Sequence, residues 1–229
     1  MAVSTKKKSG RDVNMSNLET VLVRLPNRVL SDAPEISVVN VGFGVNVYKH
    51  TLSKETCYQY ITTLNEELDG SGLYSWEASE PERNAQYFST TEEMFSAKSK
   101  DTAVLKELHD SIFDRVKQCI NDYASSWKIS ISHYDPLSFI KYSHPYNNYD
   151  YHIDDNPDIP RTVSAVVYLN DNYDGGELSF SRLDGLTIKP GAGDIVVFPS
   201  AYLYEHEAKP VLRGTKYAVA VFTHYKKRA

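Results

Sequence analysis

A histidine and an aspartate stand two positions apart in the run YDYHIDD, at His152 and Asp154. Residues i and i+2 of an extended strand point to the same side, so the imidazole and the carboxylate would enter one space. A metal site and a polar strand edge both fit this pattern. The chain has 7 histidines and 16 aspartates in 229 residues. The number of His-x-Asp triplets expected by chance in such a chain is therefore about 0.5. The triplet therefore needs support from elsewhere in the chain.

A second histidine, His206, is followed ten positions later by Lys216, inside the apolar run KYAVAVF. Lysine is rarely buried unless it is paired. Strand alternation places Lys216 on one face with Ala218, Ala220 and Phe222, which gives a face of small residues and one cation. Such a face suits the floor of a pocket for a small anion. The alternative is an edge-strand lysine that faces water.

Two histidines and one carboxylate on one face of a metal form the facial triad of non-haem Fe(II) oxygenases, which leaves positions open for other ligands. His152 and Asp154 would supply two of these ligands, and His206 would supply the third if the strands pair in space. Lys216 would then hold the far carboxylate of a dicarboxylate cosubstrate. This hypothesis requires a fold that brings distant segments together.

Two helices are predicted ahead of these residues. The first runs from Ser53, a suitable N-cap, to Gly70, a suitable stop. The second runs from about Lys100 to Trp127, because apolar residues recur there at three- and four-residue steps. These residues form one apolar stripe, which is expected to pack against the rest of the fold: Val104, Leu108, Ile112, Val116, Ile120, Tyr123 and Trp127.

Short β-type runs separated by Pro, Gly, Asn and Asp follow the second helix, which is typical of an antiparallel sandwich or barrel. Two further β-type runs, 20–25 and 36–50, precede the helices, and residues 71–89 are predicted to be loop and irregular strand. The economical interpretation is one α+β domain over residues 19–229, with the helices covering one face of a β-sandwich. Residues 1–18 are polar and are expected to form a disordered tail.

Composition excludes several classes of partner. The net charge is −5 and the only basic clusters, 6–8 and 226–228, lie at the two tails, so nucleic-acid binding is not expected. No apolar run approaches the ~18 residues of a membrane-spanning helix. No apolar core follows the first lysines as it would in a secretory signal. Cys57 and Cys119 make neither a metal spacing nor a disulfide framework. We therefore expect a cytoplasmic protein without membrane partners.

From Tyr142 to Phe222 the chain resembles the 2-oxoglutarate- and Fe(II)-dependent dioxygenases of the prolyl 4-hydroxylase family, of both the collagen and the oxygen-sensing type. The fold that this resemblance implies is a double-stranded β-helix, a jelly-roll with helices packed on its major sheet. The predicted strands and helices agree with it. The matching segments are Tyr142 with nine residues before His152-Ile153-Asp154, RTVSAVVYLND, GGELSF, IKPGAGDIVVF, and His206 with nine residues before Lys216.

The resemblance also implies roles for single residues. Tyr168 and Tyr142 would contact 2-oxoglutarate beside Lys216; the alternative is core tyrosines with satisfied hydroxyls. Tyr149 and Arg161 stand where the family contacts its substrate peptide. The implied iron ligands are His152, Asp154 and His206.

The implied reaction is hydroxylation, with Fe(II) as cofactor, 2-oxoglutarate and O2 as cosubstrates, and ascorbate as reductant. A proline within a peptide or protein is the expected substrate. Leu178 replaces a threonine of collagen-type members, and Phe222 replaces a tryptophan of many prolyl hydroxylases. Because of these differences, the identity of the substrate is left open. The position of hydroxylation on the proline ring, C3 or C4, is also left open. The alternatives are the same chemistry on a free amino acid, a nucleobase or another small molecule, and a non-catalytic jelly-roll that binds a metal.

Overall fold

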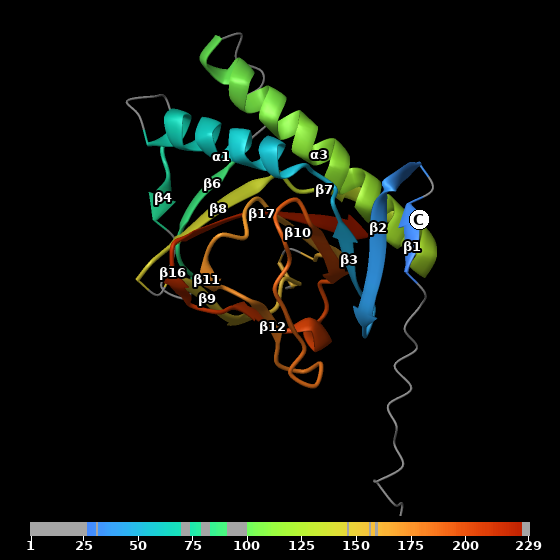
Figure 1. The fold of residues 1–229 in the computed structure, drawn as a ribbon. Coiled ribbons are helices and arrows are strands. Elements are labelled where there is room, and N and C mark those ends of the chain that lie inside the picture. The colour runs from blue at the N-terminus through green and yellow to red at the C-terminus, as the bar shows by residue number, and fades with distance from the viewer. Residues whose placement is uncertain are drawn as a thin grey trace, which may run out of the picture.

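The computed structural model describes residues 27–30, 32–69, 74–78, 83–90, 100–145, 147–155, 157–158 and 160–225. The tail expected at residues 1–18 and the strand expected at 20–25 lie outside these residues. Figure 1 shows two long helices on one side of a large β-sheet and a smaller sheet on its other side.

The two predicted helices are confirmed. Helix α1 (Lys54–Leu68) begins at the predicted N-cap, because Ser53 Oγ accepts a 3.0 Å hydrogen bond from the backbone N–H of Thr56. Helix α3 (Lys100–Trp127) has the predicted bounds. Gly70, the predicted stop of the first helix, lies outside the described residues. In the described part of the chain, no helix is long and apolar enough to cross a bilayer.

The apolar stripe of α3 packs on the large sheet along most of its length. Its two end members do not, since Val104 is 46% exposed and Trp127 is 47% exposed. They lie near the two ends of the helix. The buried members of the predicted stripe are Leu108, Ile112, Val116, Ile120 and Tyr123.

The larger sheet carries the helices, and every strand pair in the described residues is antiparallel. Its strand order is β1 (Arg28–Leu30), β2 (Ala33–Gly42), β3 (Val45–Lys49), β14 (Ile195–Pro199), β10 (Val163–Tyr168), β17 (Thr215–Tyr225), β8 (Ser138–Ser143), β6 (Gln86–Ser89) and β4 (Glu77–Ala78), and β7 (Ile131–Tyr134) pairs with β17.

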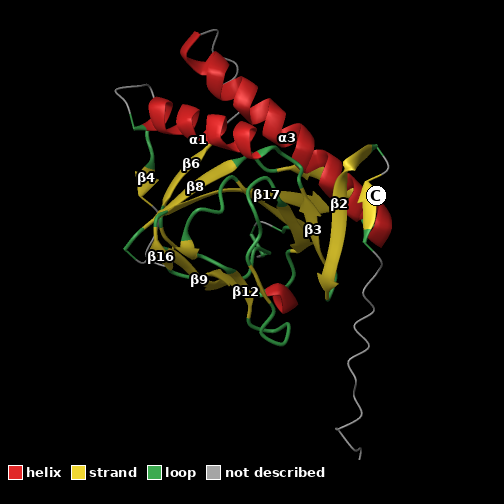
Figure 2. Cartoon of the chain, viewed as in Figure 1, coloured by secondary structure: helices red, strands yellow, loops and turns green. Residues whose placement is uncertain are grey.

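The smaller sheet faces the larger one and is seen below it in Figure 2. Its strand order is β13 (Thr187–Ile188), β12 (Leu178–Phe180), β15 (His206–Ala208), β9 (Asn148–His152) and β5 (Arg83–Asn84), and a separate pair is formed by β11 (Asp174–Gly175) and β16 (Val211–Arg213). A short 3-10 helix, η2 (Tyr202–Tyr204), precedes β15.

Strand β17 shows how the two layers share one strand. Val219 and Val221 belong to the main apolar core, which the helices cover. Lys216, Ala218 and Ala220 point to the opposite face and line a pocket between the two sheets. The alternation predicted for this strand is therefore correct, and the face that carries the lysine is the inner one.

Candidate functional site

His152, Asp154 and His206 converge between the two sheets. Strands β9 and β15 pair so that His152 and His206 stand directly opposite each other. Asp154 Oδ1 lies 3.5 Å from His152 Nε2, and Asp154 Oδ2 lies 3.7 Å from His206 Nε2. One prediction needs correction, because β9 ends at His152 and Asp154 lies beyond the strand. The carboxylate therefore reaches the site from the following loop.

Both imidazoles are oriented by backbone carbonyls. His152 Nδ1 donates to the carbonyl oxygen of Asp150 at 2.8 Å, and His206 Nδ1 donates to that of Tyr204 at 2.9 Å. Each ring therefore keeps the lone pair of Nε2 free, on the side of Asp154. The two ring planes are tilted by 54°, so the two lone pairs can be directed at one point.

Asp154 is buried, with 6% of its surface exposed, and is held as a carboxylate. Ser164 Oγ donates to Asp154 Oδ2 at 2.6 Å, and Ser200 Oγ lies 2.8 Å from Ser164 Oγ. Burial alone would raise the pKa of Asp154, but His206, His152 and the bond from Ser164 together hold it well below its ordinary value. Burial lowers the pKa of His206, and the Asp154 carboxylate partly offsets this effect. A bound metal would require the neutral ring.

Replacing Ser164 tests this arrangement. Ser164→Ala removes the hydrogen bond that orients the carboxylate, so we expect the affinity for a divalent metal to fall roughly 10- to 100-fold. Anaerobic titration with Fe(II) measures the change. Ser179→Ala, which removes a buried serine of the smaller sheet, should leave the affinity near the wild-type value. Equal losses in both variants would mean that the effect comes from altered packing.

Lys216 supplies a cation to the same pocket. Its side chain is 2% exposed, and Nζ donates to the carbonyl oxygen of Gly176 at 2.7 Å. Among the described residues, no carboxylate forms an ion pair with this ammonium. Burial lowers the pKa of Lys216 to about 7. A buried ammonium without a counter-ion is costly, so the site favours an anionic ligand.

Two tyrosines flank this lysine. The rings of Tyr142 and Tyr168 each have their centroid 5.1 Å from Lys216 Nζ. Burial raises the pKa of both phenols, so both hydroxyls remain protonated donors. Both tyrosines are buried in apolar clusters and also line the pocket beside the lysine.

Gly176 explains the GGELSF motif in physical terms. Its φ is +65°, in the left-handed region that favours glycine. A Cβ at this position would come within 2.9 Å of the Tyr173 ring and 3.2 Å of Lys216 Cδ. The glycine thus allows its carbonyl to approach and hold the Lys216 side chain.

The pocket contains both the histidine cluster and the lysine. Leu178 lies in its wall, at the position where the sequence departs from a threonine, so that wall is apolar. The residues that line the pocket are Arg83, Ile140, Tyr142, Tyr149, His152, Asp154, Val166, Tyr168, Leu178, His206, Ala208, Lys216, Ala218, Ala220 and Phe222.

Tyr149 lies closer to the cluster than strand alternation predicts. The ring of Tyr149 stacks on that of His152, with centroids 3.5 Å apart. Residues three apart on a regular strand face opposite sides, but here the register between β9 and β15 shifts, as in a β-bulge. Arg83 adds a cation that the sequence reasoning missed, since its guanidinium lies 4.3 Å from the Tyr149 ring. Its short strand pairs with β9 from a segment that was predicted to be irregular.

Arg161 lies beside the pocket, outside the residues that line it. Its guanidinium carbon is 3.8 Å from the centroid of the Phe222 ring, which does line the pocket. Arg161 Nε donates to Asp135 Oδ2 at 3.2 Å, and Nη1 donates to the carbonyl oxygen of Asp154 at 3.4 Å. The guanidinium is thus held at the edge of the site, next to the loop that carries the carboxylate ligand.

These residues fit a non-haem iron centre. Two free imidazole nitrogens and one carboxylate are the donor set of the facial triad, which suits Fe(II) and leaves other positions open. In the same pocket, Lys216 is suited to a carboxylate of a second ligand.

Comparison with known proteins agrees with this chemistry. Residues 137–224 match the model of the 2OG-Fe(II) oxygenase superfamily. Prolyl 3-hydroxylase 2 of Mus musculus is 41% identical over 66 residues, which are 27% of this chain and 9% of that protein. A PKHD-type hydroxylase of Pseudomonas putida (strain W619) is 32% identical over 132 residues, which are 53% of this chain and 56% of that protein. The matches therefore span less than two thirds of these curated relatives.

A solved structure confirms the predicted fold. A prolyl hydroxylase from Trichoplax adhaerens, in complex with a hypoxia inducible factor oxygen degradation domain peptide fragment, has a TM-score of 0.61 and 17% identity. The superposition covers 80% of this chain and 84% of that chain. At this identity the likeness concerns the architecture, a jelly-roll with helices on its major sheet.

Proposed function

We propose, from the match of residues 137–224 to the 2OG-Fe(II) oxygenase superfamily, that this protein is a 2-oxoglutarate-dependent dioxygenase that hydroxylates a prolyl residue in a peptide or protein. One observation carries the proposed reaction. The buried ammonium of Lys216, without a carboxylate partner among the described residues, lines the same pocket as His152, Asp154 and His206. A metal and a dicarboxylate can therefore be bound side by side.

His152, Asp154 and His206 would hold the iron. When bound, Fe(II) with 2-oxoglutarate and O2 supplies oxidation of a C–H bond to an alcohol, with release of succinate and CO2. The chain provides what the metal needs: Nδ1 bonds that orient both rings, and a buried carboxylate kept ionised by its neighbours. Ascorbate is proposed as the reductant that keeps the metal in its ferrous form.

Lys216 would pair with the distal carboxylate of 2-oxoglutarate, and the hydroxyls of Tyr168 and Tyr142 would donate hydrogen bonds to the same ligand. Apolar side chains such as Ile140 and Leu178 complete the pocket and exclude water. In this dry setting a charge-assisted contact is stronger than it would be at the surface.

Support for a prolyl substrate comes from the relatives and from the rim of the site. Prolyl hydroxylases are among both the sequence relatives and the solved structures. Tyr149 and Arg83 are stacked at the pocket and present an aromatic face and a cation. Arg161, with Phe222 beneath it, could donate to a peptide carbonyl through its planar fork.

A peptide assay tests the substrate. Proline-rich peptides and free proline are incubated with Fe(II), 2-oxoglutarate and ascorbate, and both succinate and a mass gain of one oxygen atom on proline are followed. We expect the mass gain on a peptide and little on free proline. If succinate rises equally with every peptide and no proline gains mass, the substrate is a different small molecule. Absence of succinate under all conditions would indicate a non-catalytic metal-binding protein.

Replacing Arg161 should raise the KM for the peptide and leave the KM for 2-oxoglutarate almost unchanged. Loss of a charged hydrogen-bond donor to the substrate backbone is expected to raise the KM for the peptide roughly tenfold in Arg161→Ala, with little change in the KM for 2-oxoglutarate. Arg213→Ala is the control, because Arg213 is exposed and pairs with Asp174 outside the pocket. Parallel increases in both Michaelis constants of Arg161→Ala would contradict a role in peptide binding.

A further inference from the structure

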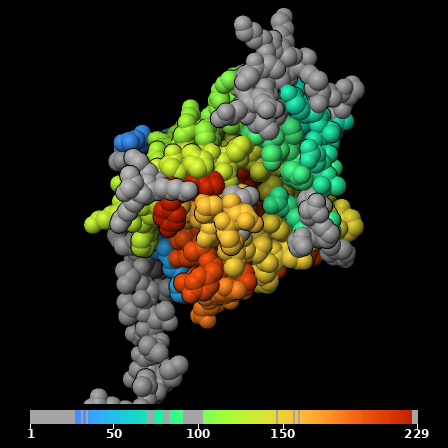
Figure 3. Space-filling view, turned by 180° about the vertical axis from the view of Figure 1, so that it is seen from behind, coloured from blue at the N-terminus to red at the C-terminus, as the bar shows by residue number. Residues whose placement is uncertain are grey.

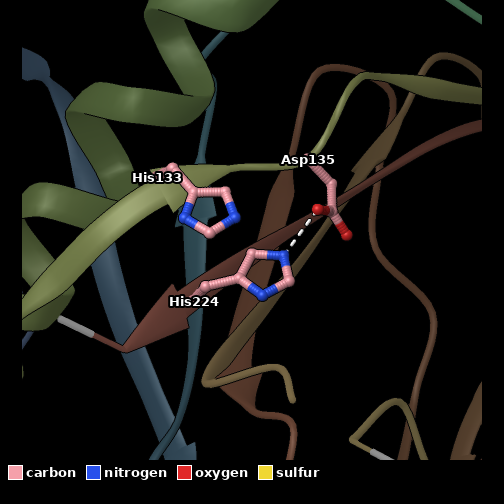
Figure 4. A group of neighbouring side chains, drawn as sticks. All are labelled: His133, Asp135 and His224. Atoms are coloured by element: carbon pink, nitrogen blue, oxygen red, sulfur yellow. Dashed lines mark hydrogen bonds and ion pairs between the residues drawn. The ribbon is translucent and has the colours of Figure 1, made fainter. Parts of the chain in front are cut away.

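We propose that the protein has a second divalent-cation site, formed by His133, Asp135 and His224. Each of the three side chains offers one ligand atom, and these atoms all lie within 4.8 Å of one another. Figure 4 shows the two imidazoles lying face to face with the Asp135 carboxylate beside them. The donor set is the same as in the pocket, two imidazoles and one carboxylate, but none of the three residues lines that pocket.

Strand pairing brings these residues together. His133 of β7 stands directly opposite His224 of β17 in the antiparallel register. Asp135 follows the end of β7, two positions after His133, as Asp154 follows His152. The chain thus contains two His-x-Asp triplets, each completed by a histidine from a paired strand.

Hydrogen bonds determine which nitrogen of each ring is available to a cation. His133 Nδ1 lies 2.9 Å from Ser132 Oγ, which leaves Nε2 as the available ligand atom. His224 Nε2 lies 2.6 Å from Asp135 Oδ1. A cation bound by these two atoms would take the place of this hydrogen bond.

Geometry makes this site weaker than the pocket site. The two rings are parallel, with an interplanar angle of 4° and centroids 4.1 Å apart, whereas the pocket imidazoles are tilted by 54°. The His133 ring must turn before both lone pairs meet one ion. His133 is exposed, so this rotation is sterically open and the ion can enter from solvent. On the face in Figure 3, atoms of the C-terminal strand, in red, reach the surface between neighbouring segments.

The ligand types define the class of ion. Imidazole nitrogens with one carboxylate suit Zn²⁺, Ni²⁺ and Cu²⁺ better than Mg²⁺ or Ca²⁺, which prefer oxygen ligands. Three protein ligands leave at least one position for water. Zn²⁺ is therefore the probe of choice, and Mg²⁺ is the ion that should not compete.

Arg161 links the second site to the first. Its Nε donates to Asp135 Oδ2 at 3.2 Å and its Nη1 to the carbonyl oxygen of Asp154 at 3.4 Å. The guanidinium therefore competes with any cation for the charge of Asp135. Removing it should raise the affinity of the second site for a cation roughly two- to fivefold, because that is the change in affinity expected from one partly exposed ion pair.

Equilibrium dialysis of the full chain against Zn²⁺, in the presence of Mg²⁺, tests the proposal. We expect two ions per chain for the wild type, one for His206→Ala, and none for His206→Ala combined with His133→Ala. His109→Ala is the matched control, because His109 pairs with Asp110 outside both clusters, and it should keep two ions. If the double variant binds as much zinc as His206→Ala alone, or if the wild type binds a single ion, the second site does not exist.

A second measurement tests the coupling to Arg161. In the His206→Ala chain, which retains only the proposed second site, Arg161→Gln should bind Zn²⁺ more tightly. Unchanged or weaker binding would show that Asp135 is not a ligand and would overturn the assignment. Neither experiment depends on turnover, so failure of the proposed hydroxylase activity would leave both results interpretable.

Discussion

His206→Ala is expected to lose Fe(II) binding at the pocket and hydroxylation together. His206 supplies one of three ligand atoms, and the loss leaves His152 and Asp154 as an incomplete pair. Removal of residues that only orient ligands already costs about 10- to 100-fold in metal affinity, so removal of a ligand should exceed about 100-fold. Anaerobic Fe(II) titration measures the affinity, and succinate release measures turnover. The fold should persist, because the buried Asp154 carboxylate keeps the hydrogen bond from Ser164 and its neighbour His152.

His109→Ala serves as the control for this variant, since His109 lies on α3 beside Asp110 and far along the chain from the pocket strands. It should bind iron as the wild type does. Full iron binding by both His206→Ala and His152→Ala would show that the metal ligands have been assigned wrongly.

Lys216→Met should bind iron normally and 2-oxoglutarate poorly. Losing a charge-assisted contact to a buried carboxylate costs about 1.5–3 kcal/mol, which is roughly a ten- to over a hundredfold weaker affinity. Two other cations that the sequence offers for this role, Arg182 and Arg213, lie elsewhere. Arg182 pairs with Glu205, and Arg213 pairs with Asp174, and neither lines the pocket. Lys189→Met, which removes a lysine bonded to the Tyr173 carbonyl, is the control.

The pH dependence of 2-oxoglutarate binding gives a second readout. The pKa of Lys216 is lowered to about 7 by burial, and a bound carboxylate raises it again by favouring the ammonium. Binding therefore takes up a proton above about pH 7, and affinity should fall as the pH rises, by up to about tenfold per unit. Lys216→Met should lose this dependence. An affinity of the wild type that stays constant from about pH 7 to about pH 9 would contradict the assignment of Lys216.

The same substitution should stabilise the cosubstrate-free fold. Between about pH 7 and about pH 10 the unfolded chain binds more protons at Lys216 than the folded chain does, so wild-type stability rises with pH in this window. A methionine has no such cost of burial. We expect its free energy of unfolding at neutral pH to rise by an amount on the order of 1–3 kcal/mol. Denaturant unfolding of both chains measures the difference.

Much of the helical layer was predictable because its signals are local. Ser53 caps α1 through a bond to a residue three positions away, and the spacing of apolar residues defined α3 along its whole length. Val104 and Trp127 were wrongly assigned to the buried stripe. Periodicity gives a face of the helix, and it does not show how much of that face other elements cover.

The site was harder to predict because it depends on strand pairing. The residue types at His152, Asp154 and His206 suggested a metal, but their proximity follows from the β9–β15 register, which the resemblance supplied. The shift in that register places Tyr149 against His152, against simple alternation. Arg83 comes from a segment without clear periodicity, and Ser164 is one of many polar strand residues. Neither carried a sequence signal that could have identified it.

The source of the oxygen atom tests the central claim most directly. A proline-rich peptide is incubated with the protein, Fe(II) and 2-oxoglutarate under heavy-oxygen-labelled O2 in ordinary water, and the peptide is analysed by fragment mass spectrometry. We predict one labelled oxygen atom on a proline ring for the wild type, and none for His206→Ala. If the proline remains unmodified while 2-oxoglutarate is consumed, or if the added oxygen comes from water, the account of this pocket as a prolyl hydroxylase site is contradicted.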